Sequence, residues 1–190
     1  EIVNKESSLV LKATKMNLDS NSYESSIWKF SKNKWVELKK SSNWNFSNPK
    51  YSNDKESISF IKTPKSTDIL DSLEKKRNPF TNKLVTRSGN QERIIFETED
   101  TISNYIWSEK DEFIYIITKE WSSDYKNIKN KTDEPLKIDK LPFRFDTTGT
   151  IYNKRFHIYK VDISTLKTKK IVDGDKESLL SISSLIEMDS

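Results

Sequence analysis

The sequence contains no cysteine, one histidine and three glycines among its 190 residues. Without cysteine it forms neither disulfides nor thiolate metal sites, and this absence favours a reducing compartment, which we take to be the cytoplasm. With so few glycines it cannot form a phosphate-binding loop. Only carboxylates remain as metal ligands, and the most prominent aspartates fall at turns, where aspartate is common in any case: Asp19, Asp54, Asp111 and Asp146. We therefore expect no metal and no cofactor.

Long apolar runs are also missing. No stretch approaches the roughly 20 residues that a helix needs to span a bilayer, so we expect no membrane partner. The first residues carry no signal-peptide pattern, and we expect a chain that opens with Glu1 to have lost its natural N-terminus. The 33 basic residues barely outnumber the 29 acidic ones and alternate with them. This mixture is typical of a solvated surface, and we expect no nucleic-acid partner.

The aromatic residues are what the sequence has in abundance. Apolar residues make up 33% of the chain and charged residues another 33%, which by itself is close to the composition of disordered proteins. The five Trp, seven Tyr and nine Phe, however, fall inside short runs typical of β-strands. A chain of 190 residues is long enough to bury a real core.

Short strands with polar turns follow one another along the chain. Residues 9–16, 25–30 and 34–38 predict an antiparallel meander with a polar corner at 31–33. In the second of these strands the alternation places an aromatic core face on the side of Ser26, Trp28 and Phe30.

Two patterns recur. "YSNDKESISFI" at 51–61 and "WSEKDEFIYII" at 107–117 each combine an aromatic–serine pair, a charged corner and an apolar strand. The strand–turn–strand pattern of residues 25–38 returns at 157–172. Strand units repeated in tandem are the signature of a β-propeller, in which each blade covers a face of its neighbour.

We therefore predict an all-β fold, a partial β-propeller of about three four-stranded antiparallel blades and the start of a fourth. The blades would span about 9–40, 44–98 and 101–173, with the fourth beginning at about 179–190, and a short helical insertion would lie near 66–77. A β-sandwich of similar strand number is the alternative. Three blades do not close a ring, so their open edges predict self-association, unless the chain is part of a longer molecule.

Longer stretches resemble a known family. "KATKMNLDSNSYESSIWKF" at 12–30 resembles the first blade of acylaminoacyl peptidases, members of the prolyl oligopeptidase family. "DEPLKIDKLPFRFDTTGTIYNKRFHIYKVDISTLKTKKIVDGD" at 133–175 resembles the third-blade insertion of the same branch. The two aromatic–serine corners are similar to the blade motif Trp-Ser-Pro-Asp-Gly-Lys of such propellers and of TolB-like ones. Neither corner has the glycine of that motif, and Trp107-Ser108 lacks the proline that follows.

The resemblance implies a function without catalysis in this segment. In that family a propeller precedes an α/β-hydrolase domain with a Ser-Asp-His triad. The glycines here, Gly89, Gly149 and Gly174, cannot form the Gly-x-Ser-x-Gly motif of the nucleophile, so the hydrolase domain is absent from these residues. The implied role is to cover the active site of a serine peptidase and admit short or N-acylated peptides. The implied partners are a C-terminal α/β-hydrolase domain and a peptide substrate.

The resemblance also points to contact residues. Arg144, Asp146 and Arg155 lie in the insertion at 134–156, which we expect to face substrate or the hydrolase domain. An ordinary ion pair of Arg144 with Asp139 or Asp146 is the alternative.

The single histidine, His157, lies in an alternating strand. We expect it to be packed or hydrogen-bonded, with substrate contact as the lesser alternative. A triad role is excluded without a partner nucleophile.

Two other functions remain open from the sequence. One is a stand-alone TolB-like propeller that serves as a protein-interaction scaffold, and the other is an unrelated β-sandwich adhesin. The gene beyond Ser190 would separate the first alternative from a peptidase, since a peptidase requires a Gly-x-Ser-x-Gly segment further along.

Overall fold

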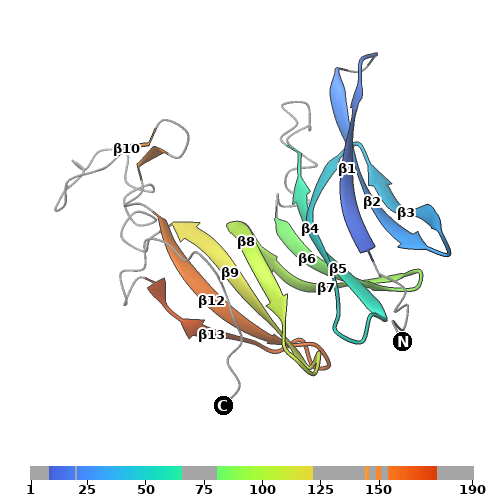
Figure 1. The fold of residues 1–190 in the computed structure, drawn as a ribbon. Coiled ribbons are helices and arrows are strands. Elements are labelled where there is room, and N and C mark those ends of the chain that lie inside the picture. Colours follow the sequence, from blue (N-terminus) through green and yellow to red (C-terminus); the bar gives the residue numbers. More distant parts are fainter. Residues whose placement is uncertain are drawn as a thin grey trace. The chain divides into compact units, whose positions relative to one another are not determined.

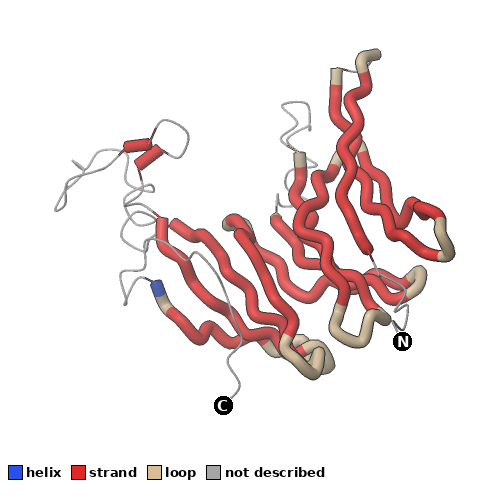
Figure 2. The backbone as a smooth tube through the Cα atoms, viewed as in Figure 1, coloured by secondary structure: helices blue, strands red, loops and turns tan. Residues whose placement is uncertain are grey.

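Strands account for most of the chain that the structure, a computed structural model, describes (Figures 1 and 2). The described residues are 9–19, 21–65, 81–121, 144–145, 149–150 and 154–174. The predicted helical insertion near 66–77 and the predicted fourth blade at 179–190 lie outside them. None of the described residues belongs to a helix that is both long enough and apolar enough to cross a bilayer.

The chain divides into two compact units. Unit 1 consists of residues 1–99 with Glu109–Asp111, and unit 2 consists of Asp100–Ser108 with residues 112–190. Each unit contains antiparallel sheets whose strands pair with their neighbours along the chain, except that β9 pairs with β12 across the small β10-β11 pair.

Unit 1 holds two sheets, with strand orders β1-β2-β3 and β4-β5-β6-β7. The first has three strands within the described residues, one fewer than we expected for a blade. The strands are β1 (Leu9–Asn17), β2 (Ser22–Ser31), β3 (Lys34–Ser41), β4 (Trp44–Tyr51), β5 (Ser57–Pro64), β6 (Asn82–Ser88) and β7 (Gln91–Thr98).

Unit 2 holds a sheet of order β13-β12-β9-β8 and a small pair, β10-β11. The strands are β8 (Thr101–Trp107), β9 (Phe113–Trp121), β10 (Arg144–Phe145), β11 (Gly149–Thr150), β12 (Lys154–Asp162) and β13 (Thr168–Val172). The strands of each large sheet follow one another in chain order, with β10 and β11 inserted between β9 and β12 in the third, and this meander is the topology of a propeller blade. The predicted all-β, partial β-propeller fold is confirmed.

The core of unit 1 lies between its two sheets. Ile27 of β2 and Phe46 of β4 are fully buried, and the ring of Phe46 meets that of Phe60 edge-on with centroids 5.5 Å apart. The remaining buried members of this cluster are Ile58 and Val85. Fully burying such a side chain stabilises a fold by about 1.5–3 kcal/mol. The first sheet therefore covers an apolar face of the second, as the propeller prediction requires within this unit.

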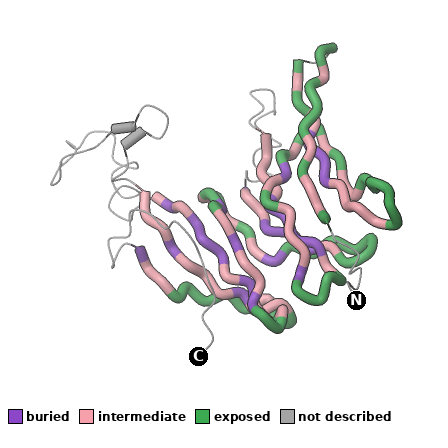
Figure 3. Tube along the Cα trace, in the orientation of Figure 1, coloured by how far each residue is buried: buried purple, intermediate pink, exposed green. Residues whose placement is uncertain are grey.

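The core face of β2 differs from the one we expected. Its most deeply buried apolar side chain is Ile27, whereas Trp28 and Phe30 remain partly exposed. In Figure 3 the buried positions lie within strands, while the turns are mostly exposed. Phe30 instead pairs with Trp35 of β3, with centroids 5.2 Å apart. Aromatic content alone misidentified the face, because the larger rings pack along their own sheet rather than against the next one.

A hydrogen bond also joins the two sheets of unit 1. The backbone N–H of Phe46 donates to Oγ of Ser25 at 3.0 Å, and both residues are buried. A buried N–H without an acceptor costs about 1–3 kcal/mol, so this serine has a specific structural role.

The two aromatic–serine corners have the same geometry. The N–H of Ser52 donates to the carbonyl of Ser57 at 2.9 Å, and Ser57 N–H donates back to Oγ of Ser52 at 3.0 Å. Ser108 and Phe113 form the same two bonds at 2.9 and 3.0 Å. Serine is thus needed at both positions for its hydroxyl.

Both corners reach the left-handed region without glycine. The φ angle is 63° at Lys55 and 56° at Asp111, the third residue after the serine in each corner. For a residue with a Cβ this conformation costs roughly 1–2 kcal/mol. Both corners therefore keep the positive φ that glycine would normally supply, and they do so with backbone strain.

The side chain of Asp111 binds the backbone of the first corner, the turn that follows Ser52. Within unit 1, its carboxylate accepts the N–H groups of Asn53 and Asp54, each at 2.9 Å. The side chain of Asn53 adds a third bond to this carboxylate at 3.0 Å. Charge-assisted bonds from successive backbone N–H groups stabilise a carboxylate well, which offsets the strain at Asp111.

Removal of the bond between the sheets should weaken the protein. We expect Ser25→Ala to lower the free energy of unfolding by about 1–3 kcal/mol, because the buried N–H of Phe46 loses its acceptor. Ser42→Ala, at an exposed serine, should change it by less than about 0.5 kcal/mol. Urea unfolding followed by tryptophan fluorescence measures both, and equal effects of the two variants would contradict the role of Ser25.

Relief of the backbone strain at Lys55 in the first corner should stabilise the folded protein. We expect Lys55→Gly to raise the free energy of unfolding by about 0.5–1 kcal/mol, because relief of a strain of about 1–2 kcal/mol outweighs the roughly 0.5–1 kcal/mol that glycine costs in chain entropy. Glu56→Gly, the next residue and one without a positive φ, should lower it by about 0.5–1 kcal/mol through added chain entropy in the unfolded state. If both glycines destabilise in thermal unfolding, the strain at Lys55 is not significant.

Candidate functional site

The three predicted contact residues are described to different extents. Arg144 lies in β10, whose side chains fall outside the description, and Asp146 lies outside the described residues, as does Asp139. Arg155 lies in β12 opposite Glu120 of β9, and its Nη1 donates to the carbonyl of Lys154 at 3.2 Å. Contact of these residues with substrate or with a hydrolase domain stays a prediction.

In unit 2 a cluster of ionisable side chains surrounds His157, which is 1% exposed. The N–H of Gly174 donates to Nδ1 of His157 at 3.3 Å, and Nζ of Lys170 lies 3.1 Å from the same atom. On the other side of the ring, Nε2 lies 3.9 Å from a carboxylate oxygen of Glu120. Asp173 approaches Nδ1 to 3.3 Å.

The contacts at Nδ1 of His157 are mixed. The backbone N–H of Gly174 and the ammonium of Lys170 approach this atom as donors, whereas the Asp173 carboxylate approaches it as an acceptor. Nε2 faces a carboxylate oxygen of Glu120 at 3.9 Å rather than a hydroxyl nucleophile. A general base needs a nucleophile within hydrogen-bond reach, so this geometry serves structure and not a catalytic triad.

Glu120 is the residue that the sequence analysis missed. It is 9% exposed, and it accepts hydrogen bonds from the hydroxyls of Tyr159 at 2.7 Å and Thr118 at 2.8 Å. A signal was present, since Glu120 continues the alternating face that contains Ile114, Ile116 and Thr118. All four are buried. An acidic residue at the end of a buried row requires partners, which are Tyr159 of β12 and Thr118 of β9 itself.

The two titrating partners shift in opposite directions. Burial alone would raise the pKa of Glu120, but the hydrogen bonds from Tyr159 and Thr118 and the nearby charges of His157 and Lys170 outweigh it, so the pKa falls below its usual value. Burial and the bond to the Glu120 carboxylate raise the pKa of the Tyr159 phenol. The tyrosine therefore stays protonated and donates, while the glutamate stays charged.

No group of three or more histidines and carboxylates in the described ranges is arranged to hold a metal ion. The cluster around His157 is accordingly an internal polar network. The hydroxyls of Thr118 and Tyr159 donate to Glu120 and the N–H of Gly174 donates to His157, so these bonds hold the strands of the sheet together.

A second polar region lies in unit 1, where a groove of about 680 Å³ runs beside the ends of several strands. It is bordered by β1, β2, β4 and β5 and by the link between β3 and β4. Its lining consists of amides, hydroxyls, two lysines and two aromatic rings: Lys12, Thr14, Asn21, Ser22, Tyr23, Ser42, Asn43, Asn45, Phe46, Ser47, Thr63 and Lys65. None of these lining residues, which all belong to the described part of the chain, is acidic.

The buried glutamate should make stability depend on acid pH. A folded-state pKa below the usual one stabilises the protein above the ordinary glutamate range, and this contribution is lost as the pH falls through the folded pKa. We expect Glu120→Gln to destabilise by about 1–3 kcal/mol at pH 7, and the deficit relative to wild type should shrink as the pH falls below that range.

Tyr159→Phe provides the internal comparison, because it removes one of the bonds that lower the pKa of Glu120. We expect it to reduce the pH dependence without abolishing it. Tyr23→Phe, at a tyrosine that is 55% exposed, should leave the pH dependence as in wild type. Urea unfolding between pH 3 and pH 7 measures all three, and a deficit of Glu120→Gln that persists at low pH would contradict this account.

The backbone of the chain is similar to two solved acylaminoacyl peptidases. One, in complex with Z-Gly-Gly-Phe-chloromethyl ketone, is 17% identical with a TM-score of 0.60, over 87% of this chain and 24% of the other. The second, from Pyrococcus horikoshii, is 17% identical with a TM-score of 0.59, over 85% of this chain and 23% of the other. TolB from Acinetobacter baumannii is less similar, at 11% identity and a TM-score of 0.47, over 86% of this chain and 30% of the other.

No protein-family profile and no curated protein sequence matches the chain. The chain spans about a quarter of the length of the two peptidases that it resembles. The resemblance seen in the sequence is thus confirmed at the level of the fold: the chain folds as a segment of an acylaminoacyl peptidase does, in blades of a β-propeller.

Proposed function

We propose that this chain is the N-terminal part of the propeller of an acylaminoacyl-peptidase-like serine peptidase. The single observation that carries the proposal is the backbone likeness to two acylaminoacyl peptidases over 87% and 85% of the chain. The recurring corners and the blade topology agree with it. The partner would be an α/β-hydrolase domain of the same protein.

The function of such a segment would be steric. The chain has no Gly-x-Ser-x-Gly segment, and its one histidine is buried between Glu120 and Gly174, so catalysis has to come from another part of the protein. A cover over an active site admits short chains, excludes folded proteins and keeps bulk water away from the reaction. One of the similar peptidases was solved with a short blocked peptide derivative, which supports short or N-acylated peptides as substrates of the parent protein.

Contacts with the hydrolase domain or the substrate would involve Arg144, Asp146 and Arg155. Self-association through open sheet edges is a further proposal. Trp35 and Val36 of the edge strand β3 are each 43% exposed, as is Ile171 of the edge strand β13. The cytoplasmic location stays a prediction.

The proposal is tested with the whole protein that the gene encodes. We expect an in-frame Gly-x-Ser-x-Gly segment beyond Ser190, and a full-length enzyme that hydrolyses N-acylated dipeptides and short peptides but spares folded proteins. The chain of 190 residues alone should have no activity. The measurement is release of a chromophore from short acyl-peptide substrates, with proteolysis of a folded protein as the comparison.

Two results would contradict the proposal. A stop codon soon after Ser190 would remove the peptidase and leave a stand-alone propeller as the function. A full-length enzyme that digests folded proteins as readily as short peptides would exclude the covering role while leaving the family relationship intact.

A further inference from the structure

We propose that His157 is a proton-operated switch that sets how the chain leaves the sheet of unit 2 after β13. When Nδ1 carries no proton, the ring holds the backbone N–H of Gly174. When both ring nitrogens are protonated, the ring holds the carboxylate of Asp173 instead and releases Gly174. The proposal rests on the contacts of Nδ1, on the charges that face the ring and on the close packing of Gly174 against β12.

The contacts of Nδ1 cannot all be satisfied in one protonation state. The N–H of Gly174 at 3.3 Å and the ammonium of Lys170 at 3.1 Å can only donate, whereas the carboxylate oxygen of Asp173 at 3.3 Å can only accept. An unprotonated Nδ1 accepts from the two donors and offers nothing to the carboxylate. A protonated Nδ1 donates to the carboxylate and then opposes both donors. One proton therefore decides which set of partners this atom binds.

The other ring nitrogen also faces a carboxylate. Nε2 lies 3.9 Å from an oxygen of Glu120, which is longer than a hydrogen bond, so this contact acts through charge. The hydroxyls of Tyr159 and Thr118 donate to Glu120 and help to keep it ionised. A doubly protonated ring thus has an anion beside each nitrogen, and this stabilises the charged state of the switch.

The charges around the ring are balanced only when it is protonated. The charged or titratable groups near the ring, among the described residues, are Glu120 of β9, Lys170 of β13, Asp173 just after β13, Tyr159 of β12 and, beside that tyrosine, Asp100. The three that approach the ring nitrogens are two carboxylates and one ammonium, so a neutral ring leaves one negative charge and an imidazolium cancels it. Because His157 is 1% exposed, water screens these charges little.

Gly174 is the element that the switch moves. A Cβ atom at this position would collide with the carbonyl oxygen of Phe156, so the backbone of Gly174 lies directly against β12. Its N–H is buried and bonds to Nδ1 of His157. A buried N–H that loses its acceptor is costly, so protonation of the ring favours withdrawal of Gly174 from β12. The chain continues from this glycine into residues 175–190, which makes the exit from the sheet dependent on pH.

The switch is tested by NMR titration of the intact chain from roughly pH 5 to pH 8, the range in which histidine as a residue type changes charge. Nitrogen shifts of the ring report the proton on each nitrogen, and the amide of Gly174 reports its release. We expect Nδ1 to gain a proton as the pH falls. Over the same range and with the same midpoint, the hydrogen-exchange protection of the Gly174 amide should fall by about tenfold or more.

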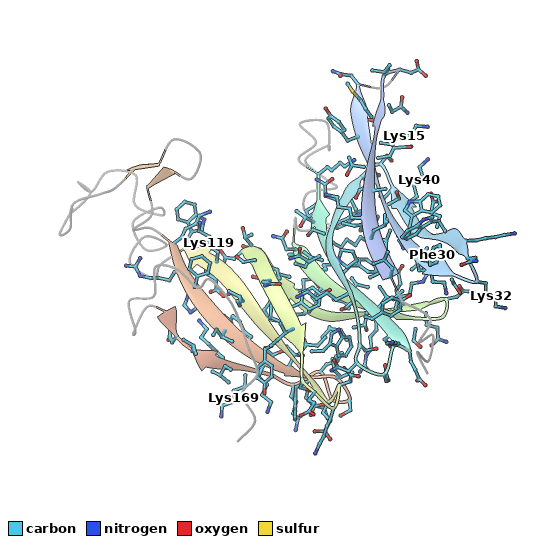
Figure 4. All side chains as sticks on the ribbon, viewed as in Figure 1. Lys15, Phe30, Lys32, Lys40, Lys119 and Lys169 are labelled. Carbon is cyan, nitrogen blue, oxygen red and sulfur yellow. The ribbon has the colours of Figure 1, made fainter. Side chains whose placement is uncertain are left out.

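Two variants should move the midpoint in opposite directions. Asp173→Asn removes the anion that the protonated Nδ1 binds and should lower the midpoint, whereas Lys170→Met removes a like charge and a donor and should raise it, by about one pH unit in each case. Lys169→Met is the matched control for the second variant. This exposed lysine of β13, labelled in Figure 4, occupies the alternate strand position, so its loss should leave the midpoint unchanged.

Three results would overturn the proposal. A ring that keeps one protonation state across the range is a fixed structural contact and not a switch. A Gly174 amide whose protection does not follow the ring shows that the proton is not coupled to the exit of the chain. Midpoints that move in the same direction in Asp173→Asn and Lys170→Met show that the two sets of partners do not compete for Nδ1.

Discussion

The fold depends on one constraint: each sheet is stable only when one of its apolar faces packs against another layer of protein. In unit 1 this need is met where Ile27 of the first sheet packs with Phe46 of the second, and where Ser25 accepts the N–H of Phe46. A short antiparallel sheet cannot bury both faces by itself. The packing of one blade on the next is therefore the condition under which strands of such polar composition become a folded unit.

The strands could be predicted because their signals are local. Period-two alternation and polar corners identified the meanders, and the shared hydrogen bonds of the Ser52 and Ser108 corners show why the two sequences look alike. The burial of His157 followed from the same alternation. Local patterns failed where partners are distant in sequence. Tyr159 bonds to Glu120 across 39 positions, and nothing near Lys65 in the chain indicates that its ammonium is buried.

The two corners keep a positive φ and their paired hydrogen bonds without the glycine of the blade motif. The glycine that normally supplies a positive φ is replaced by Lys55 in one corner and Asp111 in the other. At Asp111 the replacement has a clear physical reason, because its carboxylate accepts N–H groups that a glycine would leave to water. At Lys55, an exposed side chain, the structure shows no such gain.

The ladder between β9 and β12 determines where this protein tolerates change. Trp121, the last residue of β9, stands opposite Lys154, the first residue of β12, so the chain leaves the sheet and returns to it on the same rung. The closure entropy of the intervening segment rises only with the logarithm of its length. Residues can therefore be added or removed between these two positions without a shift in the pairing of either strand. A change in the length of that segment therefore leaves the hydrogen-bond ladder of the blade intact.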